Sequence, residues 1–287
     1  MKYNQETSYS KSKFLLTKLN NRLYLKKKPL KIDKRELLSI KKQNCFKKFF
    51  VNDFEINSAN IICDKNSILK NKSYLVEFFR GKNGQEILLT GNKNEVHILR
   101  NFYKIYFSKI ITNRKIIPRN KREIKLKFSK IIKHSNFKKI KEINQVKKYF
   151  NDLLKTNIYK YDYFDCHGDF TLSNIIVNSK DKKITLTDFQ NTYEENILQD
   201  FSKIYQEFFL GWTSRNFSEI NHLRSSIVYK SIISNNFWNI INKKMLNSLK
   251  IEFLMTILRI VPYVKKNDKI TFNWIIKSFN IIKKFRL

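Results

Sequence analysis

Apolar residues in the first third of the chain occur in short runs, a pattern typical of β-strands. Two of these runs, residues 14–18 and 22–26, are separated by Leu19-Asn20-Asn21 and predict a hairpin. Asp33 then stands where it can cap a short helix over residues 35–40. Further strands are predicted at residues 49–56, 60–63 and 74–79.

The periodicity changes after Gly81, the first glycine of the chain. Apolar residues then fall three or four positions apart, as in an amphipathic helix, at Val96, Leu99, Tyr103, Tyr106 and Ile110. Further helices are predicted at residues 140–153, 201–212, 220–233, 238–261 and 272–284, with a short extended insert at residues 164–190. We therefore predict an α+β fold with a strand-rich domain at residues 1–80 and a helix-rich domain at residues 81–287.

The charge of the chain is strongly unbalanced, with 58 Lys and Arg against 24 Asp and Glu and a net charge of +34. A field of this sign attracts polyanions such as nucleic acid or an anionic membrane surface. The chain is also crowded with Lys, Asn, Ile, Phe and Tyr, which have A/T-rich codons, and its lysines are spread along the sequence. We interpret the charge mainly as compositional drift and expect no specific nucleic-acid partner, with weak association to anionic surfaces left open.

Composition points to a folded chain, with 42% hydrophobic and 29% charged residues among 287. No stretch approaches the roughly 18 apolar residues that a membrane-spanning helix needs, and the first residues have no apolar signal core. The cysteines Cys45, Cys63 and Cys166 lack metal-binding spacing, so we expect reduced thiols in a cytoplasmic protein.

Candidate chemistry gathers around one predicted hairpin, in which residues 174–177 and 184–187 flank a polar turn. His167, Asp169 and Asn174 lie at its start, and Asp188 follows its end. Because a hairpin brings its ends together, we expect Asp169, Asn174 and Asp188 to converge. Two carboxylates and an amide oxygen are ligands that suit Mg²⁺.

This spacing of His-x-Asp, an Asn five residues later and a following Asp-Phe matches the catalytic and metal loops of kinases. The segment 167–174, with Asp188-Phe189 and Asp200 beyond it, resembles the aminoglycoside phosphotransferase and choline kinase family over residues 164–205. The resemblance implies a bilobal protein-kinase-like fold with a small strand-rich N-terminal lobe and a larger helical C-terminal lobe. It further implies Asp169 as catalytic base, Asn174 and Asp188 as Mg²⁺ ligands, His167 as a brace for the loop, and Asp200 as a structural residue that steadies the loop after Asp188.

A kinase-like N-terminal lobe also needs a lysine for the phosphates, a glutamate to hold that lysine, and a hinge strand for adenine. The candidate lysine is Lys26, at the end of the predicted strand 22–26, with Lys27 one register away and not distinguished from it. Glu36 is the candidate glutamate. The backbone groups of Glu77 and Phe79 are the candidate hinge contacts to adenine.

One part of the family pattern is missing. No glycine precedes Gly81, so there is no glycine-rich phosphate loop in the expected place. Ser8, Ser10 and Ser12 offer hydroxyls and a tight turn there, but serine does not match the close backbone approach of glycine to phosphate. This departure bears on nucleotide affinity rather than on the fold.

Together these features predict an ATP-dependent small-molecule kinase that transfers the γ-phosphate to a hydroxyl. The excess of lysine over acidic residues in 190–287 favours a sugar or sugar derivative as acceptor, in a role such as surface-polysaccharide metabolism. The alternatives are an aminoglycoside kinase or a choline or ethanolamine kinase, with an aromatic box from Tyr205, Phe209 and Trp212 for a quaternary amine. An alternative of another class is a non-catalytic basic protein that binds RNA or membrane on a kinase-like scaffold.

Overall fold

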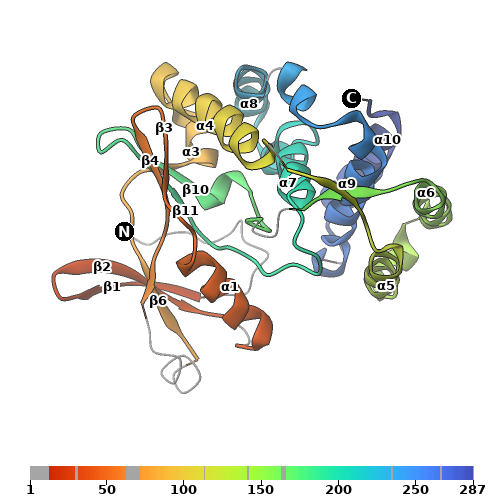
Figure 1. Ribbon diagram of the computed structural model, residues 1–287, viewed down its shortest axis with the longest axis horizontal. Coiled ribbons are helices and arrows are strands. Elements are labelled where there is room, and N and C mark those ends of the chain that lie inside the picture. Colours follow the sequence, from red (N-terminus) through yellow and green to blue (C-terminus); the bar gives the residue numbers. More distant parts are fainter. Residues whose placement is uncertain are drawn as a thin grey trace. The chain divides into compact units, whose positions relative to one another are not determined.

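The computed structural model describes residues 13–29, 32–62, 72–112, 114–140, 142–162, 166–233, 235–265 and 267–286. The chain forms two compact units (Figure 1). The first consists of residues 1–81 and 176–191, and the second of residues 82–175 and 192–287. Strands dominate the first unit and helices the second, so the α+β prediction is confirmed.

One sheet of the first unit has the strand order β1-β2-β6-β5 and is antiparallel throughout. Its strands are β1 (Lys13–Leu19), β2 (Arg22–Lys28), β5 (Ile61–Ile62) and β6 (Tyr74–Glu77). Asn20 and Asn21 adopt positive φ angles of 47° and 61°, which allow the tight turn of the predicted hairpin. The Asp33 side chain accepts hydrogen bonds from the backbone N–H groups of Arg35 and Glu36, and thereby caps helix α1 (Lys34–Asn44) as predicted.

A second sheet of this unit contains β3 (Phe49–Val51), β4 (Phe54–Ser58), β11 (Lys183–Leu186) and β10 (Ile175–Asn178), in that order. The single strand predicted over residues 49–56 is in fact the hairpin β3–β4, because Asn52 takes a positive φ of 53° and turns the chain. β11 runs parallel to β4, with Ile184 opposite Ile56. This long-range pairing groups residues 176–191 with the first unit, whereas the sequence had placed all of 81–287 in the second domain.

The second unit is mainly helical. Its helices are α3 (Gly84–Thr90), α4 (Lys93–Ile111), α5 (Lys121–Ile132), α6 (Ile143–Lys155), α7 (Leu198–Phe208), α8 (Glu219–Ile232), α9 (Leu246–Leu258) and α10 (Lys269–Lys284). Its short strands are β7 (Lys82–Asn83), β8 (Ile116–Pro118) and β9 (Tyr159–Tyr161), of which β8 and β9 pair antiparallel. The helix predicted from Val96 to Ile110 is confirmed as α4, and its buried aromatics pack around Phe170. Phe170 follows Asp169 directly, so this core anchors the candidate catalytic loop.

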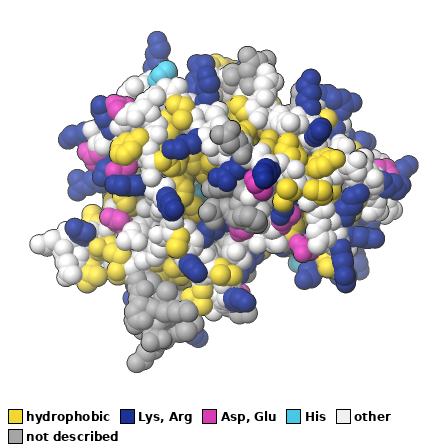
Figure 2. Space-filling view, viewed as in Figure 1, with side chains coloured by type: hydrophobic (Ala, Val, Ile, Leu, Met, Phe, Trp, Pro, Cys, Tyr) yellow, Lys and Arg dark blue, Asp and Glu magenta, His cyan; other side chains and the backbone are white. Residues whose placement is uncertain are grey.

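Lysine and arginine side chains are spread over the face shown in Figure 2 and are not gathered in one patch. This distribution agrees with their even spread along the sequence. Within the described ranges, no helix has both the length and the apolar character that crossing a bilayer requires.

Candidate active site

The loop that carries Asp169 is held by a buried carboxylate from helix α7. Asp200 is fully buried, and its two oxygens accept hydrogen bonds from the backbone N–H groups of His167 and Gly168, each at 2.7 Å. Gly168 has a φ of +83°, a conformation that glycine adopts without strain. These bonds hold the loop before Asp169, and the role of Asp200 in steadying the loop after Asp188 stays a prediction.

Asp169 itself is positioned by two neighbours in the same loop. Its N–H donates to His167 Nδ1 at 3.2 Å, and its carbonyl oxygen accepts from Asn174 Nδ2 at 2.8 Å. The His167 ring is buried and packs edge-on against Phe170. The structure therefore brings together Asp169, His167 and Asn174, three residues singled out from the sequence, and orders them by direct contacts.

Lys203 is a member of this cluster that the sequence analysis missed. Its Nζ lies 2.8 Å from Asp169 Oδ1, and its side chain is only 12% exposed. Burial pushes the pKa of Asp169 upward, but the Lys203 ammonium, helped by Arg259 and His167, brings that pKa below its ordinary value. Asp169 is therefore an ionised carboxylate at neutral pH. The only sequence signal was a lysine three positions after Asp200 on a predicted helix.

Glu207 lies one turn beyond Lys203 on α7 and is also buried. Burial, with a smaller contribution from the Asp169 charge, raises the pKa of its carboxyl to about 7, although the hydrogen bond from Thr213 and the charges of Lys203 and Arg215 act to lower it. Thr213 Oγ1 donates to Oε2, while Oε1 has no hydrogen-bond partner among the described residues. A buried carboxyl with a spare oxygen is an uncommon feature in a folded protein.

In the first unit, Lys27 forms the centre of a second charged cluster. Its Nζ lies 2.5 Å from Asp188 Oδ1 and 3.8 Å from Glu36 Oε1. The Tyr74 hydroxyl donates to the same Glu36 oxygen at 2.5 Å, and Lys27 lies over the Tyr74 ring. Burial lowers the pKa of Lys27, but Asp188, Tyr74 and Glu36 outweigh it, so the net shift is upward and the ammonium stays charged.

Lys27, rather than Lys26, occupies the position next to Glu36 and Asp188. Successive side chains of a strand point to opposite faces, so only one of the two lysines can face this cluster. On β2 Lys27 is buried and pairs with Tyr74, whereas Lys26 is partly exposed. The sequence left open whether Lys26 or Lys27 contacts the phosphates, and the register of β2 favours Lys27.

The candidate hinge residues lie at the end of β6. The Glu77 N–H donates to Asn60 O at 2.9 Å, and the Phe78 N–H donates to Leu23 O at 3.1 Å. Both N–H groups are used within the sheet. The groups that remain candidates for contact with adenine are therefore the Glu77 carbonyl and the Phe79 backbone. The candidate phosphate-loop residues Ser8, Ser10 and Ser12 lie outside the described residues, as does Cys63.

The donor set fits a hard cation. Asp188 offers a carboxylate, and Asn174 offers Oδ1 because its Nδ2 is turned toward Asp169. Across the described ranges, no group of three or more His, Cys, Asp or Glu side chains is placed to hold a metal. Asp188 belongs to the first unit and Asn174 to the second, so their convergence on one Mg²⁺ stays a prediction.

No protein-family model matches the chain, and no curated protein matches it. Among solved structures it is similar to an ethanolamine kinase from Plasmodium vivax, with 14% identity and a TM-score of 0.46 over 94% of this chain and 82% of that one. Choline kinase LicA from Streptococcus pneumoniae matches with 12% identity and a TM-score of 0.45, over 95% and 90% of the two chains. A spectinomycin phosphotransferase, solved with ADP and spectinomycin, matches with 11% identity and a TM-score of 0.36, over 96% and 93%.

Proposed function

We propose that the chain is an ATP-dependent kinase that transfers the γ-phosphate to a hydroxyl of a small acceptor. The observation that carries the proposal is the Asp169 loop, in which an ionised carboxylate is held by Asn174, His167 and the buried Asp200. In the proposed step the oxygen of the acceptor hydroxyl bonds to the γ-phosphorus, and Asp169 accepts the proton of that hydroxyl. The bond to the bridging oxygen breaks, and ADP leaves.

Nucleotide binding is assigned to the first unit. The Lys27 ammonium is the proposed contact to the phosphates, because it is charged, buried and already held by Glu36. The Glu77 carbonyl and the Phe79 backbone are the proposed contacts to adenine. When bound, Mg²⁺ supplies neutralisation of the phosphate charge, and the Asp188 carboxylate and Asn174 Oδ1 are the proposed donors for it.

For the acceptor, we propose an alcohol that also carries an amine, such as ethanolamine, choline or an amino sugar. The sequence argument for a sugar or sugar derivative counted every acidic residue of 190–287 together. In the structure Glu194 and Glu252 are engaged by the buried Arg119, and Asp200 by backbone N–H groups. Glu207 differs, because it lies near Asp169 and keeps a spare oxygen for a cationic group.

The aromatic box considered from the sequence does not account for such an amine. Tyr205 is stacked on Phe253 with ring centroids 3.9 Å apart, inside the helical core. The Trp212 ring already carries the Arg215 guanidinium, at 3.5 Å from its centroid. We therefore assign amine binding to Glu207 rather than to Tyr205, Phe209 and Trp212.

The test is ADP release with MgATP and a panel of ethanolamine, choline, amino sugars and neutral sugars. We expect turnover of an amine-bearing alcohol above the background ATPase rate. Glu207→Gln should raise the KM for that acceptor roughly 10- to 100-fold, since a charge-assisted contact is lost, and leave the KM for ATP unchanged.

Two results would count against the proposal. Preference for neutral sugars, with no effect of Glu207→Gln, would return the acceptor to the class that the sequence favoured. Equal thermal stabilisation by ATP with Mg²⁺ and by ATP in EDTA would contradict the metal donors.

A further inference from the structure

Helix α8 is apolar on two opposite sides. Its inner side is buried through Ser225, Val228, Tyr229 and Ile232, and the helix packs there against α3, α4 and α7. Arg224 fixes it further by donating to Leu88 O and Gly91 O. The outer side carries Ile220, Leu223 and Ile227, which are 81%, 66% and 62% exposed. A surface helix ordinarily shows polar residues on that side.

The three exposed side chains form one continuous stripe. They are three and four positions apart, so they lie on the same face over a length of about 10 Å. Because the opposite side of α8 already makes the packing contacts, the stripe adds nothing to the core of the second unit. A contiguous exposed apolar patch of this kind marks an interaction surface.

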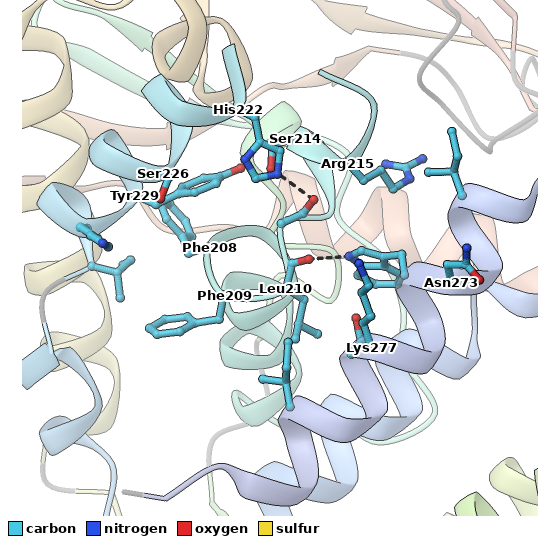
Figure 3. A pocket seen from close by; sticks show the side chains of 17 residues that line it. Phe208, Phe209, Leu210, Ser214, Arg215, His222, Ser226, Tyr229, Asn273 and Lys277 are labelled. Atoms are coloured by element: carbon cyan, nitrogen blue, oxygen red, sulfur yellow. Dashed lines mark hydrogen bonds between the residues drawn. The ribbon is translucent and has the colours of Figure 1, made fainter. Parts of the chain in front are cut away.

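A cavity of about 660 Å³ lies between α8 and α10 (Figure 3), and its wall includes His222 and Ser226, which directly precede the stripe residues Leu223 and Ile227 on α8. Apolar residues of its wall are themselves open to solvent, with Phe209 42%, Ile270 59% and Ile281 43% exposed. Lys230 of α8 and Lys277 of α10 also line it. None of the 17 described residues around the cavity is acidic.

We propose that this surface, made of the stripe Ile220, Leu223 and Ile227 and the adjoining cavity, docks on an anionic membrane. The stripe enters the boundary between head groups and acyl chains, and Lys230 and Lys277 meet lipid phosphates. The cavity receives the apolar part of a lipid. Glu219, in the first turn of α8, is an exposed carboxylate at the edge of this surface and limits how closely that end approaches.

Charge decides between a membrane and a second copy of the chain. Each copy carries a net charge of +34, so pairing two copies through this surface brings like charges together. An anionic bilayer is attracted by the same charge, and its acyl region accepts the stripe. The test does not depend on the kinase assignment, because none of the residues that it changes belongs to the Asp169 or Lys27 clusters.

The experiment is co-sedimentation of the full chain with vesicles of phosphatidylglycerol and phosphatidylcholine, against vesicles of phosphatidylcholine alone. We expect binding to the anionic vesicles, and a loss of roughly tenfold or more in affinity for the triple variant Ile220→Gln, Leu223→Gln and Ile227→Gln. The control for the single variant Leu223→Gln is Leu126→Gln. Leu126 is also exposed, at 54%, but it lies on another helix, α5. Leu126→Gln should change the affinity less than about twofold.

Melting temperatures and light scattering complete the test. All four side chains changed in the test and its control are exposed, so the melting temperature should stay near that of the unmodified chain. Equal vesicle binding by the triple variant and the unmodified chain would overturn the proposal in favour of adsorption through diffuse charge. Dimers that disappear in the triple variant, without vesicle binding by the unmodified chain, would overturn it in favour of a second copy.

Discussion

Each unit of this chain holds a lysine against a candidate carboxylate, but the two pairs are built differently. In the first unit Lys27 is enclosed by Asp188, Glu36 and Tyr74, which come from three separate segments. In the second unit Lys203, which lies on α7, forms an ion pair with one carboxylate, that of Asp169 in the candidate catalytic loop. Lys27 therefore connects β2, α1 and the segment after β11, whereas Lys203 mainly acts on the charge of a single group.

The difference indicates two separate roles for a buried cation. Lys27 has a surplus of negative neighbours, which keep it charged and oriented before any phosphate arrives. Lys203 has the reverse effect, because it keeps its partner Asp169 ionised although burial favours the protonated acid. On this view Lys27 prepares a phosphate site and Lys203 sets the state of the base, and substitutions should separate the two.

The largest effect is expected for Asp169→Asn. The amide keeps the size of the side chain but accepts no proton and carries no charge, so phosphoryl transfer should fall roughly 100- to 10,000-fold. The affinity for MgATP, measured by calorimetry, should change little, because Asp169 is not among the proposed contacts to the nucleotide or to Mg²⁺. Full activity of the variant on an acceptor that the unmodified chain uses would show that Asp169 is not the base.

Lys27→Met should come next and should act on nucleotide affinity. Because a charge-assisted contact to phosphate is lost, the dissociation constant for MgATP should rise roughly 10- to 100-fold. Lys26→Met is the matched control, one residue away on the same strand but partly exposed, and should change that constant less than about twofold.

A comparison of the two lysine variants discriminates between the registers. If Lys26→Met weakens MgATP binding and Lys27→Met does not, the lysine that contacts the phosphates is Lys26. A fall in melting temperature is expected for Lys27→Met alone, because Asp188 and Glu36 then lose a buried partner.

The features that the sequence predicted correctly are those set by residues close together in the chain. Asp169 and Asn174 are five residues apart in one loop, so their contact follows from the motif, and the helix from Val96 to Ile110 follows from its spacing. The grouping of residues 176–191 with the first unit rests on the parallel pairing of β11 with β4, which no local pattern encodes.

Two residues of the candidate site, Lys203 and Glu207, could not be found from the sequence, and the reason is the same for both. Lys203 is one of many lysines, and its importance lies in a contact to Asp169 that only the packed helix creates. In the sequence Glu207 is not distinguishable from other acidic residues on a helix, because the burial that raises the pKa of its carboxyl arises only in the folded unit. The choice between Lys26 and Lys27 depended on which face of β2 is covered, and a one-residue step exchanges the faces.

The smallest effect is expected for Lys203→Met, and it should appear in the pH dependence. Burial alone would raise the pKa of Asp169, and the Lys203 charge opposes this rise so that the net shift is downward. Without that charge the pKa rises, and the carboxylate becomes protonated at a higher pH during acidification. The acid limb of the kcat/KM profile should therefore move to higher pH, while kcat near pH 8 stays within about a few-fold of the unmodified value.

Stability should follow the same sign. Because Asp169 has a lowered pKa in the folded chain, its pairing with Lys203 stabilises the fold above the pKa of an unfolded aspartate, and this contribution is lost as the pH falls through the folded pKa. The difference in melting temperature between Lys203→Met and the unmodified chain should thus be largest near neutral pH and shrink on acidification. Lys203→Arg keeps the cation and should keep the acid limb in place. An acid limb that stays unmoved in Lys203→Met, in a variant that folds and binds MgATP, would mean that Lys203 only packs against the loop and does not set the charge of Asp169.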